Sequence, residues 1–86
     1  MTKRDIEIKL SSGLEATPIA LLVQKASQFD SKIYIEAEGG RKVNAKSIMG
    51  MMSLGVDAGD TVTVSAEGED EEAAIGAITD YLMGNN

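Results

Sequence analysis

Hydrophobic and polar residues alternate along four short segments of the chain. Every second position is apolar from Asp5 to Leu10, and the alternation recurs in Lys32–Glu36, Lys42–Ala45 and Thr61–Glu67. Side chains of a strand point alternately to two faces, so each segment predicts a β-strand with one buried face. We therefore expect four strands.

Two further segments show the spacing of helices. After a predicted N-cap at Thr17, with Pro18 in the first turn, apolar residues recur every three or four positions up to Phe29. A second, shorter helix is expected between an N-cap at Ser47 and a left-handed residue at Gly55.

A third helix is expected near the C-terminus, with Asp70 as its N-cap. Glu71 and Glu72 would lie in its first turn, where the helix dipole favours negative charge. Its predicted buried side chains are Ala74, Ile75, Ile78, Tyr81 and Leu82. The element order βαββαβα predicts an α+β fold, an open-faced β-sandwich in which three helices cover one face of a four-stranded antiparallel sheet.

Composition places the chain among soluble globular proteins. With 86 residues, 43% of them apolar and 26% charged, we expect residues 1–86 to form a single domain. No apolar run approaches the roughly 18 residues of a membrane span. The N-terminus carries no signal-peptide or lipidation pattern, so we expect a cytoplasmic protein without a membrane partner.

Missing residue types narrow the chemistry further. The chain has no cysteine and no histidine, which excludes disulfides, thiol chemistry and the usual zinc ligands and removes the commonest general base. We therefore expect no catalytic residues, metal or cofactor, and no enzyme activity. The net charge of −6 and the content of two tyrosines, one phenylalanine and no tryptophan argue against direct binding of nucleic acid.

The segment 44–56 carries more apolar side chains than a short helix can bury. Three of the five methionines fall within four positions. We therefore expect Ile48, Met49 and Met52 to be exposed. An exposed group of flexible methionines suits a partner surface that must adapt. The side chains expected in the core are Met51, Leu54 and Val56.

Ser47 has two interpretations. It can simply cap the helix, or it can be a phosphorylation site, because a phosphate there would meet the positive end of the helix dipole, with Lys46 nearby. The first helix leaves a similar choice, since Ala20, Val23 and Gln24 form a second face that can meet either a neighbouring element or a partner.

Two motifs in the chain resemble the HPr family of the bacterial sugar phosphotransferase system. One is the GLXAXP pattern at positions 13–18, followed by Ala20 and the LVQ triplet at 22–24; the other, longer motif runs from Lys42 to Gly55. The likeness covers nearly the whole chain and is strongest to the Gram-positive branch, whose serine is phosphorylated by an ATP-dependent kinase. The resemblance implies the βαββαβα fold and phosphorylation at Ser47.

The chain departs from the family at two positions. Glu15 stands where HPr has the histidine that carries phosphate, and Thr17 stands where HPr has an arginine that helps to hold it. A carboxylate would have to form a far more reactive acyl phosphate, so the usual phosphocarrier step is excluded. Glu15 is then either a neutral loss of function or a fixed charge that imitates a phosphorylated residue.

The remaining features resemble the histidine-lacking, Crh-like branch of the family. This resemblance implies that HPr kinase/phosphorylase modifies Ser47 and that the product acts as corepressor of a CcpA-type transcription regulator in carbon catabolite repression. With Thr17 in place of the arginine, the identity of the regulator stays open. The residues that match the family's partner-binding face, together with the neighbouring lysine, are Ala20, Val23, Gln24, Lys46, Ile48, Met49 and Met52.

The same residues suggest two other functions. An inactive paralogue or adaptor could dock on phosphotransferase system enzymes through Ile48, Met49 and Met52 without carrying phosphate. A carrier with a prosthetic group on serine fits poorly, because such proteins are helical and use an Asp-Ser-Leu motif, whereas Ser47 follows a lysine. Whether the chain is a monomer or a strand-exchanged dimer stays open.

Overall fold

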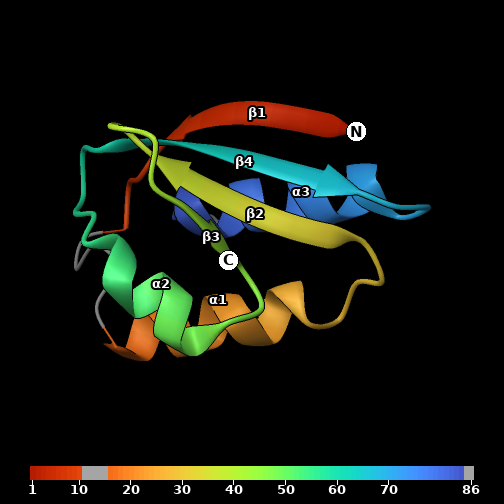
Figure 1. Cartoon of the computed structure of the whole chain (residues 1–86), viewed down its shortest axis with the longest axis horizontal. Coiled ribbons are helices and arrows are strands. Elements are labelled where there is room, and N and C mark those ends of the chain that lie inside the picture. Colours follow the sequence, from red (N-terminus) through yellow and green to blue (C-terminus); the bar gives the residue numbers. More distant parts are fainter. Residues whose placement is uncertain (11–15, 85–86) are drawn as a thin grey trace.

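A computed structural model of the protein describes residues 1–10 and 16–84, with the backbone alone at Ala16 and Thr17 (Figure 1). Seven elements follow one another in the expected order βαββαβα. They are β1 (Thr2–Glu7), α1 (Ala16–Ala26), β2 (Lys32–Ala37), β3 (Lys42–Asn44), α2 (Ile48–Leu54), β4 (Thr61–Glu67) and α3 (Glu71–Leu82).

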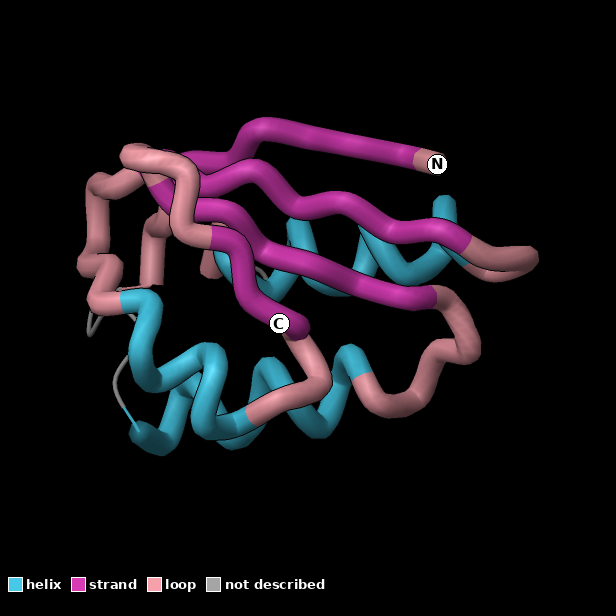
Figure 2. Tube along the Cα trace, viewed as in Figure 1, coloured by secondary structure: helices cyan, strands magenta, loops and turns pink. Residues whose placement is uncertain are grey.

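The four strands form one antiparallel sheet in the order β1-β4-β2-β3. Figure 2 shows the strands as a single layer with the helices on one side of it. Val62 of β4 lies opposite Ile6 of β1, and Val64 lies opposite Ile35 of β2. These four side chains are buried under the helices, so the alternation in the sequence corresponds to the inner face of the sheet.

The hydrophobic core joins this inner face to all three helices. Ile19, Leu22 and Ala26 of α1 are buried, as their spacing predicted. Met51, Leu54 and Val56 are buried as well, although α2 has only seven residues. The expected fold class, an α+β sheet covered on one face by three helices, is therefore confirmed. The same sheet contradicts the helical carrier-protein alternative.

The first strand lies three residues earlier than predicted. Its ladder pairs Thr2 with Ala66 and ends where Glu7 meets Thr61, the first residue of β4. Beyond that point the backbone N–H of Lys9 donates to Leu82 O at 2.8 Å, so the chain leaves the sheet toward α3. Alternation marks which side chains are buried, whereas the length of the partner strand decides where pairing begins and ends.

The first helix also differs from the prediction at both ends. It begins at Ala16, so Thr17 is a first-turn residue and not the N-cap, while Pro18 lies in the first turn as expected. At the other end the N–H of Phe29 donates to Ala26 O at 3.2 Å. This three-residue spacing tightens the last turn, and the α-helix therefore ends before Phe29.

Asp70 precedes α3 as predicted, but its side chain does not cap that helix. The carboxylate instead accepts hydrogen bonds from the N–H groups of Asp30 (2.9 Å) and Ser31 (3.0 Å) and from the Ser31 hydroxyl. The Ser31 hydroxyl, followed by the Asp30 N–H, lowers the pKa of the Asp70 carboxyl below its ordinary value of 3.8. Asp70 thus fastens the turn between α1 and β2 to the start of α3.

None of the helices in residues 1–10 and 16–84 has both the length and the apolar character needed to cross a membrane.

We expect Asp70→Asn to lower Tm at pH 7, because an amide accepts the three hydrogen bonds less strongly than a carboxylate does. A carboxyl group whose pKa is lower in the folded than in the unfolded state stabilises the fold at pH values above its unfolded-state pKa. This stabilisation is lost as the pH falls through the folded-state pKa. The difference in Tm between wild type and variant should therefore narrow below pH 3.8.

Thermal unfolding followed by circular dichroism between pH 2 and pH 7 measures both effects. Asp80→Asn is the control, because Asp80 is an exposed carboxylate of α3, the helix that Asp70 precedes. An equal Tm for wild type and Asp70→Asn at neutral pH would contradict the role given to this carboxylate.

Candidate functional site

Ser47 is positioned by a turn that follows β3. The side-chain Oδ1 of Asn44 accepts the N–H of Lys46 at 2.8 Å, and the Asn44 carbonyl accepts the N–H of Ser47 at 3.0 Å. Ser47 is extended (φ −109°, ψ 113°), and its carbonyl accepts the first helical hydrogen bond from Met51 at 2.9 Å. Asn44 therefore decides where α2 begins.

The Ser47 hydroxyl caps α2 as the sequence predicted. Its Oγ accepts a hydrogen bond from the N–H of Gly50 at 3.1 Å. The helix ends at Gly55, which has the left-handed backbone (φ 67°, ψ 38°) expected of it. Ser47 as a residue is only partly buried.

Gly50 keeps a space open beside this hydroxyl. A Cβ at position 50 would lie 3.3 Å from Ser47 Oγ, which is tighter than ordinary contact, and 3.4 Å from Val43 Cβ. Glycine inside a helix costs about 1 kcal/mol relative to alanine. Gly50 was not predicted to be a site residue, although a glycine in the middle of a predicted helix was the signal that could have identified it.

The outer face of α2 is apolar and open to solvent. Ile48 is 49% exposed, Met49 80% and Met52 53%. We call these three side chains the α2 surface. They are exposed as predicted, whereas Met51, between them in sequence, is fully buried. The hydroxyl of Ser47 therefore lies one residue away from an uncovered apolar patch.

Helix α1 lies beside α2 on the same side of the sheet (Figure 1). Of the three residues predicted there, Ala20 and Gln24 are exposed, but Val23 is only 8% exposed and belongs to the core. Because α1 packs against both α2 and α3, its buried stripe is wider than the sheet contact alone requires, and it includes Val23.

Leu21 lies off the predicted buried stripe of α1 and is 46% exposed. It follows the buried Ile19 by two residues, a rotation of about 200° around the helix. That rotation places Leu21 away from the core, as the spacing of the buried positions predicted.

Lys46 links the start of α2 to the end of α1. Its Nζ donates to the backbone carbonyl of Phe29 at 2.6 Å, and the side chain is partly buried. This partner is a neutral carbonyl and not a carboxylate. The positive charge of Lys46 is therefore held at the Phe29 carbonyl and is not neutralised by this contact.

The degenerate phosphocarrier position, Glu15, lies outside the described residues, so its role stays a prediction. The nearby first turn of α1 is held by α3, because the hydroxyl of Tyr81 donates to Pro18 O at 2.9 Å. Burial raises the pKa of Tyr81, which keeps this hydroxyl protonated and able to donate.

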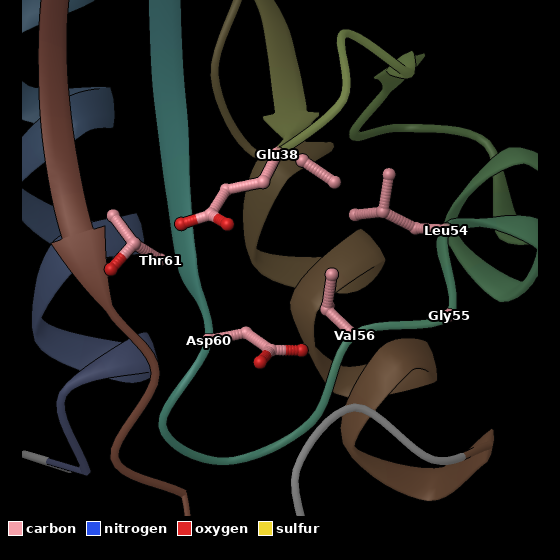
Figure 3. Close-up of a pocket in the computed structure, with 7 residues that line it drawn as sticks. Glu38, Leu54, Gly55, Val56, Asp60 and Thr61 are labelled. Carbon is pink, nitrogen blue, oxygen red and sulfur yellow. The ribbon is translucent and has the colours of Figure 1, made fainter.

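A cavity of about 180 Å³ lies at the C-terminal end of α2. Figure 3 shows Leu54 and Val56 on one side of it and Glu38, Asp60 and Thr61 on the other. None of the described site residues lines this cavity. The candidate site is thus a surface around the start of α2 and not a pocket.

Comparison with known proteins places this geometry in a family. The sequence model described as the PTS HPr component phosphorylation site matches residues 2–83. The HPr-like protein Crh of Halalkalibacterium halodurans is 49% identical over 82 residues, which cover 95% of this chain and 96% of that protein. The HPr-like protein Crh of Bacillus subtilis is 48% identical over 83 residues, 96% of each chain.

A solved structure shares the whole fold. The crystal structure of HPr-C-His from Thermoanaerobacter tengcongensis has a TM-score of 0.90 and 53% sequence identity to this chain, and the match covers 100% of this chain and 99% of the other. The sequence likeness and the arrangement of the elements therefore point to one and the same family.

Removing the capping hydroxyl should destabilise the protein measurably. We expect Ser47→Ala to lower the free energy of unfolding by about 1 kcal/mol, because the Gly50 N–H loses its acceptor. Urea denaturation measures this difference. In Ser53→Ala, the control in the same helix, the hydroxyl removed only donates to Gly50 O, so no comparable loss is expected. Equal losses in the two variants would contradict the capping role.

Proposed function

The chain belongs to the HPr family, and on that basis we propose that it is an HPr-like regulatory phosphoprotein and not an enzyme. In this proposal HPr kinase/phosphorylase phosphorylates Ser47. The phosphorylated protein then acts as corepressor of a CcpA-type transcription regulator in carbon catabolite repression.

One observation carries the proposal. A partly buried serine at the start of α2 lies directly beside the α2 surface, whose three apolar side chains are about half exposed or more. A monomeric protein gains nothing in stability by leaving such side chains uncovered. A partner that buries them would meet residue 47 in the same contact, so a charge placed there can control the binding.

The chemistry requires only a kinase and ATP. Ser47 Oγ attacks the γ-phosphorus, the bond to the bridging oxygen breaks, ADP leaves, and the serine proton passes to a base of the kinase. The product carries a charge of about −1.5 to −2 at pH 7. Lys46, whose ammonium is bonded to a neutral carbonyl, supplies a positive charge from the adjacent residue.

A phosphocarrier role through histidine is excluded by composition, since none of the 86 residues is a histidine. At the position where the family carries that residue, this chain has Glu15. The proposed regulation through Ser47 needs no phosphate on residue 15.

A second candidate function follows from the exposed α2 surface itself. The three side chains are uncovered in the unmodified protein, so the chain could dock as an adaptor on phosphotransferase system enzymes without any phosphate. Titration with the first enzyme of that system, followed through the backbone amides of α1 and α2, separates the two candidates. The adaptor binds it in the unmodified state, whereas a protein regulated only through serine does not.

The direct test is phosphorylation in vitro. Incubated with an HPr kinase/phosphorylase and ATP, the wild-type chain should gain one phosphate, as measured by intact-protein mass spectrometry. Ser47→Ala should gain none, and Ser53→Ala should behave as wild type, because Ser53 is an exposed serine of the same helix. A wild-type protein that takes up no phosphate, or takes it up at another residue, would overturn the proposal.

We further expect Gly50→Ala to slow phosphorylation. Its methyl group would crowd Ser47 Oγ from 3.3 Å, and a barrier higher by about 1.4 kcal/mol lowers kcat/KM about tenfold. Gly76→Ala is the matched control, because Gly76 lies inside α3 and a Cβ there would meet nothing within 4 Å. Kinase assays with both variants measure the effect, and an unchanged rate in Gly50→Ala would show that the open space does not matter.

A further inference from the structure

The methionines of α2 differ sharply in exposure. Met49 is 80% exposed and Met52 53%, whereas Met51 of the same helix is 0% exposed. The fold therefore presents two methionine side chains to solvent within two turns of the proposed phosphorylation site and shields a third. Met1 and Met83, at 66% and 39% exposure, lie at the two ends of the described chain.

Exposure matters because a thioether is the apolar side chain most easily made polar. A sulfur lone pair attacks one oxygen of hydrogen peroxide, an S–O bond forms, and the O–O bond breaks. Sulfur loses two electrons, the second peroxide oxygen leaves as hydroxide, and hydroxide takes the proton of the transferred oxygen to become water. A buried sulfur such as that of Met51 is protected because the peroxide cannot reach it.

We propose that Met49 and Met52 are oxidative modification sites, and that their conversion to methionine sulfoxide switches off binding at the α2 surface. The first half of this inference rests on exposure alone, and the second half rests on the function proposed above.

Two of the three side chains of the α2 surface would change in character at once. A sulfoxide replaces an adaptable apolar group by a polar, chiral one that a partner has to desolvate. Ile48 cannot be oxidised in this way and would be the single apolar member left. Peroxide and phosphate would thus act on the same surface through different atoms, and methionine sulfoxide reductases would reverse the oxidation.

The first experiment maps the sites. The folded wild-type chain is treated with hydrogen peroxide, the reaction is stopped with catalase, and peptides are analysed by mass spectrometry over time. Met49 and Met52 should gain oxygen well before Met51. Oxidation of Met51 as fast as of its two neighbours would overturn the site assignment, and this arm needs no kinase.

The second experiment measures the switch. After removal of peroxide, phosphorylation by an HPr kinase/phosphorylase is compared with that of the untreated sample of the same variant, so that any basal effect of a substitution cancels. Oxidised wild type should lose about tenfold in rate and regain it with methionine sulfoxide reductases. Met49→Leu/Met52→Leu should keep its rate although Met1 and Met83 still oxidise, and Met83→Leu should respond as wild type does.

Retention on a hydrophobic interaction column gives a second readout that does not depend on the kinase. Oxidation should shorten the retention of wild type and of Met83→Leu more than that of the double leucine variant. If untreated wild type takes up no phosphate, the proposed function fails while this arm still tests the surface. If oxidised wild type keeps both its phosphorylation rate and its retention, the switch itself is overturned.

Discussion

Burial of one face of the four-stranded sheet is the constraint on which the rest of the structure depends. The inner side chains of β1, β2 and β4 are buried under helices, with α3 against β1 and β4 and with α1 packed against both α2 and α3. The short α2 helix completes the cover by inserting Met51 and Leu54. A helix of seven residues that anchors through one side necessarily presents its other side to solvent, and in this chain that side is apolar.

The capping of α2 and the proposed regulation share a single oxygen atom. Ser47 Oγ accepts the hydrogen bond that starts the helix, and the same atom would receive the phosphate. The residues that hold it in place, Asn44 before it and Gly50 after it, act through the backbone or through a missing side chain. The chemistry of the site therefore depends on how the chain turns from β3 into α2 more than on any charged side chain.

Much of the fold and part of the site could be predicted from the sequence, and the errors have a common cause. The helical spacing of apolar residues and the expected capping residues located α2 from Ser47 to Gly55 and placed Met49 and Met51 on opposite sides of it. These signals could be read from the sequence because they are local. Strand β1 was misplaced because its ends are set by a partner about 60 residues away. The capping role of Asp70 was wrong for the same reason, since the turn at Ser31 decides its surroundings. Val23, for which the sequence left open a neighbouring element or a partner, is buried where α1 packs against α2 and α3.

The turn between α1 and β2 is held in place by contacts from both Lys46 and Asp70. Three consecutive residues of that turn form hydrogen bonds to these two side chains. The carbonyl of Phe29 accepts from the ammonium that precedes α2, and the N–H groups of Asp30 and Ser31 donate to the carboxylate that precedes α3. A shift of the start of either helix would therefore disturb hydrogen bonds to the same short stretch of backbone. The loop thus connects the residue before Ser47 to the residue that precedes α3.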